Sequence, residues 1–137
     1  MQTKNVPEFG VAYSYDAVAS FYKHDATLVS FVIVKGPRIA ALRLREDYNP
    51  NILAHPAQVW VGEIPKAVLD WGNNLANDTA LVPVFVKRQG KLNYTFVGDH
   101  EVLERDATPA ELAKARAEVP HTRGISRIVF LKRVEKA

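Results

Sequence analysis

Short runs of β-branched residues, each ended by turn residues, restrict this chain more than any other feature of its sequence. The run Thr27–Lys35 reads Thr-Leu-Val-Ser-Phe-Val-Ile-Val-Lys and stops at a glycine-proline pair, which predicts one strand. Arg38–Arg45 resumes the pattern with one apolar face, while Arg43 and Arg45 fall on the opposite, basic face. We expect this second run to be a half-exposed strand that pairs with the first.

The rest of the chain adds more strands and a few helices. Thr108-Pro109-Ala110-Glu111 is a capping box with proline at the first helical position, and it predicts a helix that runs to about Val119. The last run, Ile125–Val134, carries apolar residues on both parities, which is typical of a central strand. The other predicted segments are a short helix or turn within Val11–Tyr22, a loop at Glu46–Pro56, a strand at Gln58–Val61, a helix at Pro65–Asn77, a strand at Leu81–Lys87 with Pro83 at an edge, a bulge or the strand start, and a strand within Asn93–Glu104 with Gly98 at a bulge.

The order of these segments indicates the fold class. Strand pairs dominate and helices are inserted among them, so regular strand–helix alternation, which a doubly wound parallel sheet needs, is missing. We therefore expect an α+β fold with a curved, mainly antiparallel sheet or a partly closed β-barrel, flanked by two or three helices. Residues 1–137 are predicted to form a single domain, with a loose N-terminus at residues 1–10.

The composition excludes several kinds of chemistry. The chain has 137 residues and a formal charge of +3, with 47% hydrophobic and 24% charged residues, which are ordinary globular values. The absence of cysteine excludes a disulfide scaffold, a Cys-ligated zinc site, a thiol nucleophile and an iron–sulfur cluster. The first residues show no apolar signal-peptide region, and no apolar run approaches the ~20 residues of a membrane span. We expect a cytoplasmic protein with no membrane partner.

No familiar catalytic motif is present. The sequence lacks the glycine-rich phosphate-binding patterns and the Gly-x-Ser-x-Gly nucleophile elbow. Asp99-His100-Glu101 could contribute to a metal site, but a solvated bulge explains the same residues. The sequence therefore assigns no catalytic residue, no metal ligand and no cofactor.

Cations on the predicted strands and turns are the first candidate for binding. Basic side chains on strands and hairpin tips suit phosphate contacts, which give affinity without reading sequence. A solvated strand face and the protection of a sheet edge are the alternative explanations. The candidate phosphate-binding residues are Arg43, Arg45, Lys87, Arg88, Lys91, Arg123 and Arg127.

Aromatic and amide side chains form the second candidate. An aromatic ring with a polar group can stack on a nucleic-acid base, and Asp47-Tyr48-Asn49 offers a carboxylate, a phenol and an amide that suit the edge of a planar ligand. Turn chemistry explains the Asp and Asn equally well, and a tryptophan between two valines is more often a core residue. The candidate base or ligand pocket comprises Tyr13, Tyr15, Asp47, Tyr48, Asn49 and Trp60.

A family resemblance covers roughly Asn51–Val134. His55-Pro56-Ala57-Gln58-Val59-Trp60-Val61-Gly62, the helix after it, Val82-Pro83-Val84-Phe85-Val86-Lys87 and Tyr94-Thr95-Phe96-Val97-Gly98 resemble the SRA-like/PUA-like modules of modification-dependent restriction proteins. The resemblance implies a curved β-barrel with flanking helices that reads DNA, commonly by housing a flipped, modified base. The nuclease domain that usually accompanies such modules has no counterpart here, so the implied role is a reader, or one part of a system with a nuclease or other effector protein.

Two main functions follow as hypotheses. The first is a module that binds DNA, plain or modified, without catalysis of its own. The second is a small enzyme or small-molecule-binding protein with a polar pocket around Asp47, Tyr48, Asn49 and His100, with His55 nearby. A protein-interaction domain that uses exposed sheet edges is a third alternative.

Overall fold

The described residues form one curled sheet and three helices. In the computed structural model, the described residues are 6–22, 26–29, 31–35, 38–63, 66–118 and 124–135, and for 26–29 the backbone alone is described. The strands are β1 (Ala12–Tyr13), β2 (Ala26–Val29), β3 (Val32–Lys35), β4 (Arg38–Arg45), β5 (Ala57–Gly62), β6 (Val82–Lys87), β7 (Tyr94–Val102) and β8 (Ile125–Val134). The helices are α1 (Tyr15–Ser20), α2 (Lys66–Ala76) and α3 (Pro109–Glu118).

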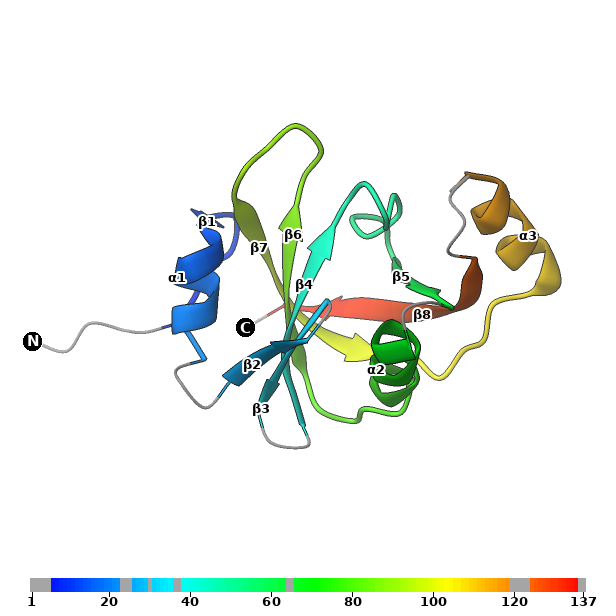
Figure 1. The fold of residues 1–137 in the computed structure, drawn as a ribbon, viewed down its shortest axis with the longest axis horizontal. Coiled ribbons are helices and arrows are strands. Elements are labelled where there is room, and N and C mark those ends of the chain that lie inside the picture. Colours follow the sequence, from blue (N-terminus) through cyan, green and yellow to red (C-terminus); the bar gives the residue numbers. More distant parts are fainter. Residues whose placement is uncertain are drawn as a thin grey trace, which may run out of the picture.

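The strands form one eight-stranded sheet in the order β2-β3-β4-β6-β7-β8-β5, with β1 paired to β7 beside this path. Among the described strands, β4 and β6 pair in parallel and all other pairings are antiparallel. The sheet curls into a half-barrel with α1 and α3 at opposite ends (Figure 1). The predicted α+β fold with a curved, mainly antiparallel sheet and flanking helices is confirmed.

The inner face of the curl holds the largest core. Valines and leucines of one parity from β3, β4, β5, β6 and β8 pack there with Leu75 of α2. Gly72 lets α2 approach the sheet closely, because a Cβ at this position would overlap the Val61 side chain of β5. The concave face of the half-barrel is therefore filled by packed side chains and covered by α2.

The outer face is covered at two places. Near α1, the buried residues Ile33, Phe85 and Phe96 pack with Val18 of that helix. At the other end, Trp60 and Phe130 pack with Ala115 of α3. Because both faces are covered along β8, that strand carries apolar residues on both parities, and its predicted central position, between β7 and β5, is confirmed.

Three local predictions are confirmed in detail. The Glu111 amide donates to Thr108 Oγ1 at 3.1 Å and the Thr108 amide donates to Glu111 Oε1 at 2.9 Å, which is the capping box of α3. Pro83 lies beside a register shift between β6 and β7. Gly98 belongs to the bulge at this shift and has a φ of 101°, which glycine adopts without steric cost.

One strand prediction is wrong. Thr27–Lys35 does not form a single strand, since β2 and β3 pair antiparallel with each other, with Leu28 opposite Ile33. The β character of this run is confirmed, but a β-branched run suits one long strand and two short ones equally.

Candidate nucleic-acid interface

The pairing of three strands brings basic and aromatic residues to one end of the sheet. In the parallel pairing of β4 and β6, Arg43 lies opposite Phe85 and Arg45 lies opposite Lys87. Across the next pairing, Lys87 lies opposite Tyr94 of β7. Because directly opposite residues share a face, these side chains lie on the outer face, beside α1.

Arg43 is held between two tyrosine rings. Its guanidinium carbon lies 4.8 Å from the ring centroid of Tyr15 on α1 and 5.7 Å from that of Tyr94. Its Nη1 donates to the Tyr94 hydroxyl at 3.0 Å. These contacts fix the charge on the outer face of β4, since a cation is attracted to the face of an aromatic ring.

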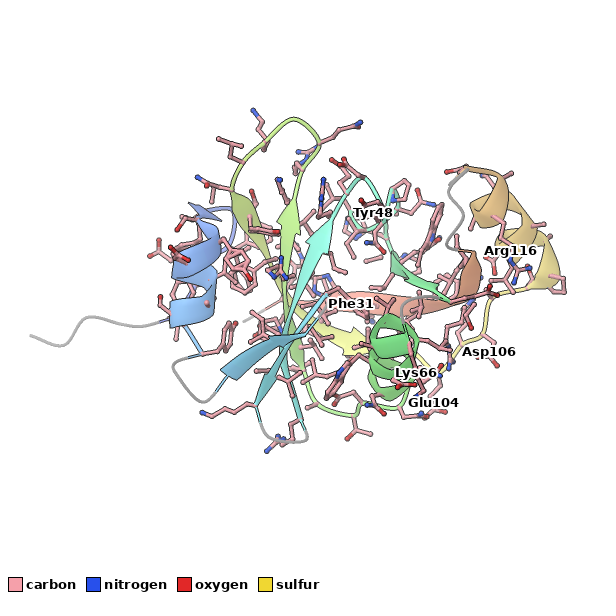
Figure 2. The ribbon with its side chains drawn as sticks, viewed as in Figure 1. Phe31, Tyr48, Lys66, Glu104, Asp106 and Arg116 are labelled. Atoms are coloured by element: carbon pink, nitrogen blue, oxygen red, sulfur yellow. The ribbon has the colours of Figure 1, made fainter. Side chains whose placement is uncertain are left out.

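Arg45 is more exposed and organises the turn that follows β4. Its Nη2 lies 3.1 Å from Asp47 Oδ2, with both side chains about two-fifths exposed (43% and 38%). The guanidinium carbon also lies 5.1 Å from the ring centroid of Tyr48, whose exposed side chain extends from the turn (Figure 2). Arg45 and Tyr48 thus present a charge and a ring side by side.

The β6–β7 hairpin continues the basic surface. Arg88 and Lys91 are exposed on its turn, and Leu92 beside them is 88% exposed. Glu46 ties this hairpin to the end of β4, because its Oε1 accepts from the Gln89 amide at 3.0 Å and lies 3.7 Å from Arg88 Nε. We call Arg43, Arg45, Lys87, Arg88 and Lys91, together with Tyr15 and Tyr48, the cationic surface.

The cationic surface keeps an excess of positive charge. Glu46 and Asp47 beside it pair with Arg88 and Arg45, and the Arg45–Asp47 pair is open to solvent, whereas the Glu46 side chain is only 23% exposed. An exposed pair such as Arg45–Asp47 contributes only about 0–1 kcal/mol to stability, so a phosphate can replace Asp47 at small cost. Five of the seven cations predicted from the sequence therefore lie together on β4, β6 and the hairpin, and three of them, Arg45, Arg88 and Lys91, are exposed.

The other two predicted cations do not join this surface. Arg127 on β8 donates to Asn73 Oδ1 at 3.1 Å, and its Nη2 lies 3.5 Å from Asp106 Oδ1. Asp106 lies well away from Tyr48, towards α3 (Figure 2). Arg123 lies outside the described residues. Arg127 thus serves to join β8 to α2 and to the segment before α3.

Three predicted pocket residues have structural roles instead. Trp60 is 8% exposed and packs in the core under α3. Tyr13 is half-buried, with its ring centroid 4.9 Å from that of Phe21 and its hydroxyl accepting from the Glu8 amide at 2.8 Å. Asn49 is 5% exposed, and its Oδ1 accepts from the Trp60 amide at 2.8 Å while its Nδ2 donates to the Arg45 carbonyl. Asn49 therefore covers the edge of β5 rather than reading a ligand.

Asp47 and His100, which the alternative hypothesis places in one polar pocket, lie at opposite ends of β6 in the described structure. His100 lies opposite Val82 at the start of β6, whereas Asp47 follows Arg45, which lies opposite Lys87 at the end of β6. Five residues of strand, about 16 Å, separate these two ends. His100 is buried, its Nδ1 lies 3.0 Å from the Gly98 carbonyl oxygen, and burial lowers its pKa. Burial therefore favours the neutral form of this imidazole.

Sequence reasoning did not place Tyr94 and Glu46 in the site. Tyr94 binds Arg43, and Glu46 links the turn after β4 to the hairpin. Both roles depend on the pairing of β4 with β6, which joins segments about forty residues apart and leaves no local signal.

Comparison of the chain with protein-family models, with curated proteins and with solved structures finds no match. Within the described part of the chain, no cluster of three or more acidic or histidine side chains could hold a metal ion. The described helices include none that is both long and apolar enough to cross a membrane.

Proposed function

We propose that the cationic surface binds the phosphate backbone of DNA. The observation that carries the proposal is the register of β4 and β6, which gathers Arg43, Arg45 and Lys87 next to the exposed Arg88 and Lys91 of the hairpin. Phosphate contacts of this kind release condensed counterions and supply most of the affinity for a nucleic acid.

Each group has a distinct part in the proposed complex. Arg88 and Lys91 contact phosphates directly, and Arg45 exchanges Asp47 for a phosphate oxygen. Arg43 is already ordered by Tyr15 and Tyr94, so it loses little side-chain freedom on binding. Tyr48 lies beside Arg45, and its exposed ring stacks on an unstacked base.

The finer features of the proposal come from the family resemblance. It favours duplex DNA with a modified base as the target, and a nuclease or other effector protein as the partner that acts after recognition. Asn49 is buried and its Oδ1 accepts from the Trp60 amide, so the proposal assigns base recognition to the exposed ring of Tyr48.

A salt series with labelled DNA tests the proposal. We expect binding of plain, methylated and hydroxymethylated duplexes to weaken steeply with salt, with a slope of log K against log salt of about −2.7 to −4.5 for three to five neutralised phosphates. A variant carrying Arg45→Ala, Arg88→Ala and Lys91→Ala should lose most of this slope.

A matched variant controls for net charge. Arg38→Ala, Lys66→Ala and Lys114→Ala remove the same number of cations from exposed positions outside the cationic surface, and Lys66 lies on α2 (Figure 2). Affinity for DNA should remain within about twofold, since distant exposed charges are screened at ordinary ionic strength. Equal losses of affinity in the two variants, or no binding to any duplex at low salt, would refute the proposal.

A further inference from the structure

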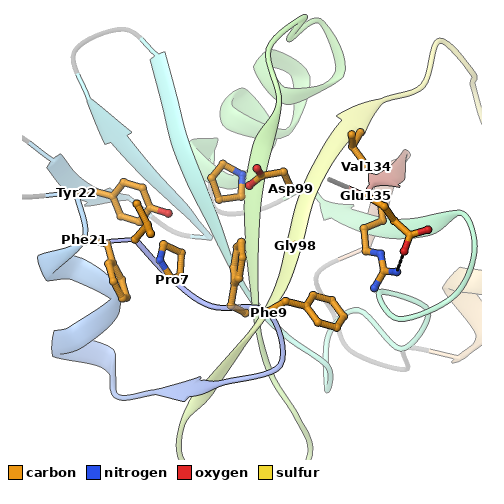
Figure 3. Close-up of a pocket in the computed structure, with 12 residues that line it drawn as sticks. Pro7, Phe9, Phe21, Tyr22, Gly98, Asp99, Val134 and Glu135 are labelled. Atoms are coloured by element: carbon orange, nitrogen blue, oxygen red, sulfur yellow. Dashed lines mark hydrogen bonds and ion pairs between the residues drawn. The ribbon is translucent and has the colours of Figure 1, made fainter. Parts of the chain in front are cut away.

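A second feature is a cavity of about 540 Å³ beside the middle of β7, and none of the residues of the cationic surface lines it. It lies where the N-terminal segment crosses β7 and β8, and Phe9, Phe21, Tyr22 and Phe96 form aromatic walls around it (Figure 3). Its size falls within the ~300–1,000 Å³ typical of small-molecule sites.

The β7 bulge builds this cavity. Asp99 lies opposite Pro83 and Phe96 lies opposite Phe85, so Val97 and Gly98 together face the single residue Val84. Because Pro83 and Phe85 share the outer face, the extra residue turns Asp99 to the same face as Phe96. Without the bulge, alternation would direct the carboxylate into the inner core. The bulge therefore places a carboxylate among aromatic rings.

Gly98 keeps the cavity open at this point. A Cβ on Gly98 would lie 3.2 Å from Cδ of Arg133 and 3.7 Å from Cδ1 of Phe9, so both side chains lie directly across the glycine. The Arg133 guanidinium lies 4.7 Å from the Phe9 ring centroid, and its Nη2 lies 3.1 Å from Glu135 Oε1. The Arg133 guanidinium, a positive charge in the cavity wall, thus already contacts Phe9 and Glu135.

The polar groups that remain are acceptors and a neutral hydroxyl. Asp99 is half-buried, and within the described part of the chain its carboxylate makes no hydrogen bond or ion pair. The Tyr22 hydroxyl is buried without a hydrogen-bond partner among the described residues, and it points to the side of the cavity where Asp99 lies (Figure 3). Burial, and then the charge of Asp99, raise the pKa of Tyr22, so this group stays protonated.

We propose that this cavity binds a small planar organic cation, an amidinium or a protonated aromatic amine, with its charge on Asp99 and its apolar body between the rings. A half-buried carboxylate that has no ion pair among the described residues repels anions, and a cation that pairs with it offsets part of the cost of its burial. An amidinium can donate two parallel hydrogen bonds to a carboxylate, and aromatic faces attract positive charge.

Benzamidine and its neutral isostere benzamide test this inference directly. We expect benzamidine to give saturable shifts of the Gly98 and Asp99 amide signals in ¹⁵N–¹H NMR spectra, with benzamide at least about tenfold weaker because it lacks the charge-assisted pair. Asp99→Asn should weaken benzamidine about tenfold and leave benzamide unchanged. Asp106→Asn, which removes a carboxylate that is 93% exposed elsewhere, should change neither.

A second variant keeps the test decisive if Asp99→Asn fails to fold. Phe9 is 61% exposed, so Phe9→Leu is tolerated by the fold and should weaken benzamidine about threefold by removing one ring face. Equal binding of benzamidine and benzamide, shifts that lie away from the cavity, or no saturation would overturn the inference. Binding of DNA by the Asp99→Asn variant should be unchanged, so each of the two proposals can be refuted independently of the other.

Discussion

Arg45 and Lys87 lie directly opposite each other in the parallel pairing of β4 and β6. Like charges in this position destabilise a sheet by a few tenths of a kcal/mol up to about 1 kcal/mol. Asp47 lies 3.1 Å from Arg45 and offsets part of this cost. Two cations held side by side at some expense to stability are more readily explained by a polyanionic ligand than by folding.

The first prediction separates binding from stability at this pair. Replacing both residues, Arg45→Gln with Lys87→Gln, should reduce the salt slope of DNA binding by about 1.8, since each phosphate that is no longer neutralised accounts for about 0.9. The free energy of unfolding in urea should change by less than about 0.5 kcal/mol, because removal of the repulsion and removal of the Asp47 ion pair nearly cancel. A parallel decrease in stability and affinity would show that the pair serves the fold instead.

The second prediction concerns Tyr48. Tyr48→Ala should weaken binding to DNA with an unstacked base by about tenfold, since stacking of one base on an aromatic ring contributes about 1–3 kcal/mol. Tyr48→Phe keeps the ring and its contact with Arg45 and should bind like the parent chain. Fluorescence anisotropy with a mismatched duplex and a fully paired duplex measures both variants. If Tyr48→Phe is as weak as Tyr48→Ala, the hydroxyl and not the ring is responsible.

Local signals in the sequence predicted local structure well. The capping box of α3 depends on Thr108 and Glu111, which are three residues apart, and the bulge depends on Gly98 and Pro83. The central position of β8 followed from its apolar residues on both parities. Each of these features is specified by residues in one or two short segments.

The site was less predictable because it depends on pairing between distant segments. Arg43 and Arg127 both alternate with apolar residues on strands, yet one lies between tyrosines and the other is bound to Asn73. The sequence near Asn49 suits a turn and a ligand site equally. The Asn49 side chain accepts a hydrogen bond from the Trp60 backbone amide only because β5 lies beside the turn. Tertiary contacts, rather than residue type, separated the candidates.

The third prediction concerns the contact between α2 and β5. Gly72→Ala should lower the free energy of unfolding by about 1–3 kcal/mol despite the better helix propensity of alanine, because the added methyl overlaps Val61. In a double-mutant cycle, Gly72→Ala should cost less stability in a Val61→Ala background than in the parent chain, since Val61→Ala removes the methyl groups that the new Cβ overlaps. Additive effects in the cycle would contradict the close approach of the helix to the strand.

The fourth prediction concerns the pH dependence of stability. Burial lowers the pKa of His100, with a further lowering from Arg133 and from His55, while the Gly98 carbonyl and Asp99 act in the opposite direction. In the unfolded chain the imidazole titrates near its ordinary value of about 6.5. Between that value and the lower folded pKa, the unfolded state binds a proton that the folded state does not. The free energy of unfolding should therefore fall as the pH drops from about 7 to about 5, and His100→Gln should flatten this fall, as measured by urea unfolding.

His55→Gln, measured in the same way, controls for the neighbouring imidazole and should leave most of the fall in place. A direct NMR titration decides the cause, because an imidazole that titrates at or above its ordinary value in the folded protein would contradict the prediction.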